Sequence, residues 1–245
     1  MDTRHPLPTP LPEPTGGARW RLRAGAAESR EHVDLPLDAP PDDLAGAPQR
    51  PLRDAELWLL ARRTQGAALR VDFELRTSIV RQVFRRDFVY VSRLLHALEA
   101  SRRVQGLDRA SLDDALATLQ RCEEDVHELL DRIQADLAAR LAGRPRPEAQ
   151  VAFPHPARFQ ATVVCPFARR HLALLMHADD ALADLERAWL MGAVEPAVRA
   201  ALAGECRRAL HGYKDLACDR RASIGAEVRR VNAQRRQAAR RTREG

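Results

Sequence analysis

The chain has 245 residues, enough for one substantial hydrophobic core with smaller flanking segments but not for two large domains. Its formal net charge of +6 is concentrated at one end: residues 220–245 hold nine arginines and two glutamates, whereas the preceding residues carry 31 basic and 32 acidic side chains. No stretch approaches 18 consecutive apolar residues, no secretory signal is recognisable, and the four cysteines lack zinc-finger spacing. We therefore expect a cytoplasmic protein with reduced thiols, no cofactor and no membrane span.

The N-terminal segment, residues 1–52, is rich in proline and holds ten of the sixteen prolines in the chain. Proline removes backbone donors, and the segment has little apolar mass with which to build a core. We predict that it is largely disordered, that residues 53–219 form the folded domain, and that residues 220–245 form an arginine-rich tail.

A short helix is expected to open at Asp54, as its N-cap, and to end near Gly66. The next segment, residues 69–76, alternates apolar and polar side chains, which predicts a strand. Its apolar face consists of Leu69, Val71, Phe73 and Leu75, and its polar face of Arg70, Asp72, Glu74 and Arg76.

This strand is the most informative feature of the chain, because the other long patterns are helical. A lone strand leaves backbone groups unpaired and needs a partner. The same strand of a second copy would give a two-stranded ribbon at 68–76, whereas the alternative within the chain is residues 159–164. The sequence leaves both open.

The remaining patterns are helical. A short amphipathic helix around Ile79–Phe84 precedes a second pattern from Phe88 that ends at Gly106. A long helix is predicted over 111–141, a further helix from Ala168 is broken at Gly192, and Pro196 opens the last. We expect a mainly α-helical bundle with one short β element.

Catalytic motifs are absent from the sequence. There is no phosphate-binding glycine loop, zinc-protease helix or nucleophile elbow, so we do not expect an enzyme. His171 and His177 lie six residues apart, about 240° around a helix, and cannot share a metal ion. The acidic residues Asp179, Asp180 and Asp184 are interpreted as a solvated helical face.

The charge distribution favours nucleic acid as a partner, because arginines gain affinity by releasing counterions from phosphates. On the strand, Arg70 and Arg76 could read guanine, and Asp72 or Glu74 could accept from cytosine. The two acidic side chains cancel the charge of the two arginines, so this face of the strand is neutral. An edge strand packed in a helical domain, with no role in DNA binding, is therefore the alternative. The candidate phosphate contacts are Arg81, Arg85, Arg220, Arg221, Arg229, Arg230, Arg235, Arg236, Arg240 and Arg241.

Two stretches resemble the AcaB family, a former domain-of-unknown-function family common in integrating conjugative elements. Residues 69–77, followed by a helix bearing arginine and phenylalanine, resemble the start of its shared region. Residues 151–214 resemble its later half, with an acidic cluster at 177–180, Gly192 after the next helix and Tyr213 near the end of the last. The resemblance covers residues 69–216.

The resemblance implies a ribbon-helix-helix-like homodimer that binds DNA and regulates the transfer genes of a mobile element. The alternative is a non-catalytic accessory or scaffolding protein of such an element, which binds other proteins through its helical body. Pairing of the strand across a dimer would favour the first function, and pairing with residues 159–164 would favour the second.

Overall fold

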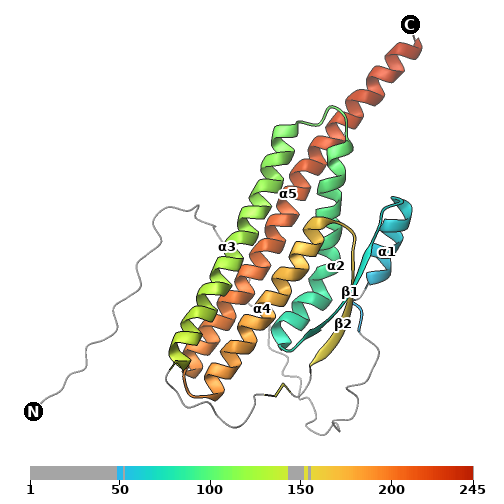
Figure 1. Cartoon of the computed structure of the whole chain (residues 1–245). Helices are drawn as coiled ribbons and strands as arrows, with labels where there is room; N and C mark the ends of the chain where they lie inside the picture. Colours follow the sequence, from blue (N-terminus) through green and yellow to red (C-terminus); the bar gives the residue numbers. More distant parts are fainter. Residues whose placement is uncertain (1–48, 52, 143–151, 154–155, 245) are drawn as a thin grey trace, which may run out of the picture. The chain divides into compact units, whose positions relative to one another are not determined.

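The computed structural model describes residues 49–51, 53–142, 152–153 and 156–244. Nearly all of the segment predicted to be disordered, residues 1–52, lies outside the described residues. Four long helices, α2 (Ser78–Ala100), α3 (Arg109–Leu141), α4 (Pro166–Leu190) and α5 (Pro196–Glu244), pack alongside one another (Figure 1). The shorter elements α1 (Asp54–Arg63), β1 (Leu69–Leu75) and β2 (Ala157–Val163) complete the fold. The prediction of a mainly α-helical bundle with a short β element is confirmed.

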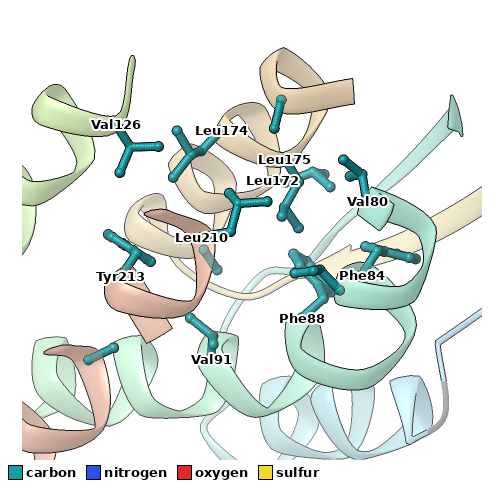
Figure 2. Close-up of a cluster of buried hydrophobic side chains, with 14 of the residues drawn as sticks. Val80, Phe84, Phe88, Val91, Val126, Leu172, Leu174, Leu175, Leu210 and Tyr213 are labelled. Atoms are coloured by element: carbon teal, nitrogen blue, oxygen red, sulfur yellow. The ribbon is translucent and has the colours of Figure 1, made fainter. Parts of the chain in front are cut away.

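The core forms where α2, α4 and α5 meet, with α3 closing the bundle (Figure 2). The fully buried side chains of Phe84 and Phe88 lie 5.0 Å apart, centroid to centroid. The ring of His171 stacks between Phe88, at 6.1 Å, and Tyr213, at 5.2 Å. This three-ring stack joins α2, α4 and α5 and excludes water from the imidazole.

Most helix ends follow the sequence signals. The carboxylate of Asp108 accepts from the backbone N–H of Ala110 and Ser111, at 3.1 and 3.2 Å, and so caps α3. Gly192 has a φ of +67° just after α4, a conformation that glycine adopts without strain, and Pro196 begins α5.

Two helix predictions are wrong. α2 is one continuous helix of 23 residues, where the sequence suggested a short helix and a second one from Phe88. No glycine or proline interrupts it, and Phe84 and Phe88, four residues apart, bury on one face. β1 is therefore followed by the 23-residue α2 and, after a short turn at 101–108, by α3. Asp54 is the first residue of α1 rather than its cap, and its side chain points to β2.

β1 pairs in antiparallel fashion with β2 of the same chain, with Leu69 opposite Val163 and Leu75 opposite Ala157. Of the two partners that the sequence allowed, the structure therefore contains the one within the chain. β2 occupies one edge of β1, so the described sheet is formed within a single chain. The apolar face of β1 packs against the core of its own chain. The ring of Phe73 stacks on that of Phe159 at 6.0 Å and meets the edge of Phe84 at 5.0 Å, centroid to centroid.

Two buried aspartates fasten the sheet to the helices. Asp179 on α4 accepts four hydrogen bonds from the turn between β1 and α2: the N–H and hydroxyl of Thr77, at 2.8 and 2.7 Å, and the N–H and Nε of Arg76, at 2.9 and 3.3 Å. Asp54 on α1 accepts the N–H and hydroxyl of Thr162, at 3.0 and 2.9 Å. Each carboxylate satisfies a threonine that would otherwise be buried without a partner.

A third buried carboxylate joins α2 to α5. Asp87 accepts from Nζ of Lys214 at 2.9 Å and from the neighbouring Arg86 at 2.7 Å. Burial opposes ionisation of Asp87, but these cations hold its pKa below the usual range.

Among the helices that the structure describes, none has a stretch long and apolar enough to cross a membrane.

Candidate nucleic-acid interface

The C-terminal part of α5 is an exposed helix that carries arginines. α5 continues without a break through residue 220, where the sequence predicted the start of a separate tail. Its last buried apolar side chains are Ile224 and Val231. Residues 232–242 are all exposed, and the helix runs on past the ends of its neighbours (Figure 1). We call residues 232–244 the α5 extension.

The α5 extension has no acidic residue between 232 and 242. Arg236 and Arg240 follow Arg229 by seven and eleven residues, which places all three within about 40° on one side of the helix. Arg235 donates to Oε1 of Gln105 at 3.0 Å, and Arg241 is exposed. Among the described side chains, no carboxylate is ion-paired with these five arginines. Their charge is therefore available to an anionic partner.

The arginines nearer the bundle are partly engaged. Arg220 lies 3.8 Å from a carboxylate oxygen of Asp114 on α3, and Arg230 lies 3.8 Å from Glu227, three residues earlier. Arg221 is half-buried along α5. These contacts reduce the charge that this part of the helix can offer to phosphates.

The polar face of β1 divides into an exposed part and a bound part. Arg70, Asp72 and Glu74 are exposed, with the guanidinium of Arg70 4.6 Å from the centre of the Trp58 ring and Asp72 accepting from Gln160 at 2.8 Å. The fourth residue of this face, however, is not free to read bases.

That residue, Arg76, is ion-paired with both Asp179 and Asp180. Burial lowers its pKa, but the two carboxylates outweigh burial and raise it. The candidate reading face therefore keeps one arginine and two acids.

Two candidate arginines lie on the first turns of α2. Nε of Arg81 donates to the backbone oxygen of Thr77 at 3.3 Å, and burial together with the charge of Arg85 lowers the pKa of Arg81. Arg85 is exposed, lies 5.4 Å from the centre of the Phe159 ring and bonds to Gln49. They form a separate basic pair on α2.

Sequence reasoning missed the role of Asp179, which it assigned to a solvated face. A signal was present: Asp179 lies four residues after Leu175 and three before Leu182, so it belongs to the apolar stripe of α4. Asp180 is exposed, and Asp184 bonds to Gln134 and Arg187. No group of three potential metal ligands occurs among the described residues.

The fold and surface thus define a four-helix bundle with a small intrachain sheet and an arginine-bearing terminal helix. No family model matches the chain, and no curated protein does. Among solved structures, the chain resembles that of selenomethionine-containing AcaB from uropathogenic E. coli, with a TM-score of 0.51 and 15% identity over 71% of this chain and 86% of that one. The likeness supports an AcaB-like fold.

Proposed function

We propose that this protein is a DNA-binding regulator of a conjugative or integrative mobile element, without a cofactor or catalysis. The observation that carries the proposal is the α5 extension, which holds exposed arginines on a helix with no apolar face. An AcaB-like fold and the sequence resemblance to the AcaB family support the mobile-element setting. DNA is the polyanion that a regulator of such an element meets.

The physical basis is counterion release. Each arginine that reaches a phosphate frees condensed cations from the duplex, which lowers affinity for DNA as salt rises. A helix is narrow enough to enter the major groove, and the stripe of Arg229, Arg236 and Arg240 would face one phosphate backbone. Phosphate contacts position the protein but do not distinguish one DNA sequence from another. Sequence specificity must therefore come from side chains that contact the bases.

On the sheet, Arg70 is the residue that remains able to contact a guanine edge. Asp72 and Glu74 are exposed beside it and could accept from cytosine. We keep the homodimer as part of the proposal, with β2 occupying one edge of β1 in each chain.

The test compares two variants that lose the same charge. One replaces Arg235, Arg236, Arg240 and Arg241 by alanine; its matched control replaces four exposed arginines elsewhere, Arg62, Arg63, Arg207 and Arg208. Affinity for a random duplex is measured by fluorescence anisotropy over a range of salt concentrations. If all four replaced arginines contact phosphates, their loss makes the log–log salt slope shallower by roughly 3 to 4 units. The control should change it little, and equal slopes for both variants would contradict the proposal.

The second candidate is an accessory or scaffolding protein of the same element. The pairing of β1 with β2 inside one chain favours it, because the sequence offered this pairing as the alternative to a ribbon shared by two copies. The same titrations separate the two functions. A wild-type affinity for duplex DNA that equals that of the α5-extension variant at physiological salt would favour the accessory protein.

A further inference from the structure

Two histidines on neighbouring helices face each other at the surface of the bundle. His127 on α3 and His177 on α4 are both partly exposed, and their Nδ1 atoms lie 2.8 Å apart. The ring centroids are 5.1 Å apart, so the two nitrogens lie between the rings. No local spacing predicts this pair, because 50 residues separate its members.

The hydrogen bonds around His177 determine its tautomer. Nε2 of Gln134 donates to a carboxylate oxygen of Asp184 at 3.0 Å, so Oε1 of Gln134 is the atom that faces Nε2 of His177, at 2.9 Å. Asp131 places a carboxylate oxygen 3.3 Å from the same nitrogen. Both neighbours accept hydrogen bonds, so Nε2 carries the proton and Nδ1 of His177 presents a lone pair to His127.

His177 is therefore oriented as a metal-ligating histidine is. Such a residue coordinates through one ring nitrogen and donates the other N–H to a carboxylate or carbonyl oxygen, here those of Asp131 and Gln134. Two nitrogens about 2.1 Å from one ion lie roughly 2.9 to 3.4 Å apart at octahedral or tetrahedral angles. The observed separation of 2.8 Å is close to this range, and small rotations of the two rings turn both lone pairs toward one ion.

The surrounding charge favours a cation. Residues 122–131 of α3 contain five acidic side chains and no arginine or lysine, and α4 has neither of these two basic residues between positions 171 and 186. Glu124 and Asp131, both exposed, lie one turn before and one turn after His127 on the same side of α3. A positive ion between the rings would be attracted by these carboxylates.

We propose that the Nδ1 atoms of His127 and His177 bind a divalent transition metal ion, with water in the remaining coordination positions and Asp131 orienting His177. The class comprises the ions that prefer imidazole, Zn²⁺, Ni²⁺ and Cu²⁺, rather than the oxygen-binding Mg²⁺ and Ca²⁺. The ion takes the place of the proton between the rings, which moves through water to Nε2 of His127. Two protein ligands are fewer than those of a permanent zinc site, so the ion is exchangeable and joins α3 to α4 only while it is bound.

This inference goes beyond the proposed function, and its test needs no nucleic acid. The full chain is titrated with NiCl₂ in neutral buffer by isothermal titration calorimetry. The double variant His127→Gln/His177→Gln should bind Ni²⁺ roughly tenfold more weakly or worse, since the loss of an outer partner alone costs about this much. Its matched control, His96→Gln/His211→Gln, removes two partly exposed histidines from α2 and α5 and should keep the wild-type affinity. Equal affinities for the two double variants, or a wild-type chain that binds no Ni²⁺, would overturn the proposal.

A second comparison leaves both histidines in place. Asp131 is exposed, so Asp131→Asn should preserve the fold, but it should weaken Ni²⁺ binding about tenfold because the N–H of His177 loses its carboxylate. Asp125→Asn removes the same charge from an exposed position on another side of α3 and should change the affinity less than about twofold, because water and salt screen that charge. MgCl₂ should not compete with Ni²⁺. Equal losses for the two aspartate variants, or displacement of Ni²⁺ by Mg²⁺, would assign the ion to the acidic surface and exclude the histidine site.

Discussion

The two ends of this molecule are stabilised in opposite ways. At the sheet, buried carboxylates bind backbone and side-chain donors of β1, β2 and α2, so polar groups are satisfied inside the protein. In the α5 extension, polar groups face water and the helix has no apolar contact after Val231. A change at the sheet should therefore affect folding, whereas a change in the α5 extension should affect what the protein binds.

Asp179→Ala is the strongest test of the expectation that changes at the sheet affect folding. The substitution leaves the N–H and hydroxyl of Thr77 buried without an acceptor and releases Arg76. We expect a loss of about 4 kcal/mol in the free energy of unfolding, since removing one side of a buried charged network is among the costliest changes. Urea unfolding followed by circular dichroism measures it.

Asp180→Ala is the control, because Asp180 is exposed and contributes a surface ion pair. It should cost less than about 1 kcal/mol. Equal losses for the two variants would mean that the hydrogen bonds of Asp179 to Arg76 and Thr77 contribute no more to stability than a surface ion pair.

Truncation at two points along α5 tests where the stabilising part of the helix ends. Removing residues 220–245 deletes the buried Ile224 and Val231 and should cost about 3 kcal/mol of unfolding free energy. Removing residues 233–245 deletes, among the side chains that the structure describes, exposed positions alone and should cost less than about 1 kcal/mol. Thermal and urea unfolding of both truncated chains give the comparison. A large loss from the shorter deletion would show that the α5 extension packs against the body.

In the core, we expect a smaller effect, a dependence of stability on pH that is caused by His171. Burial lowers the pKa of His171 to about 4, against the weaker opposing influence of Asp87, and neither ring nitrogen has a hydrogen-bond partner among the described residues. The unfolded chain, with a histidine pKa near 6.5, binds a proton that the folded chain does not bind between about pH 6.5 and 4. Stability is therefore lost as the pH falls through this window.

At pH 5 the loss relative to pH 7 should be about 2 kcal/mol for this residue. His171→Phe keeps an aromatic ring in the stack between Phe88 and Tyr213 and cannot titrate. The difference between the wild type and this variant, measured by urea unfolding at both pH values, isolates the histidine. A difference that does not change with pH would show that His171 gains a proton as easily when folded as when unfolded.

The local signals in the sequence were sufficient to predict most of the long helices. They were insufficient to predict which segments pair with each other in the fold. The three-four spacing of α3 and the prolines and glycine around α4 and α5 correctly predicted those helices, because each is determined within a few residues. Alternation predicted β1 but could not choose between two partners, because pairing depends on residues about 90 positions away. The continuity of α2 was missed because two short apolar patterns were interpreted as two helices.

The candidate site divides in the same way. Charge counting located Arg235, Arg236, Arg240 and Arg241, and the structure places these four side chains exposed on a helix. It could not show that Arg76 is held by Asp179 and Asp180, since that contact joins residues more than 100 positions apart. Only the position of Asp179 within the apolar stripe of α4 hinted at its burial.

The pairing of Lys214 with Asp87 has a consequence for regulation. Lys214 is the single lysine of the chain, and its amine is bonded to a buried carboxylate on α2. The α5 extension contains no lysine, so acetylation of lysine side chains cannot reduce its charge. If the α5 extension binds DNA as proposed, competing cations would weaken its contacts with phosphates, whereas lysine acetylation would not.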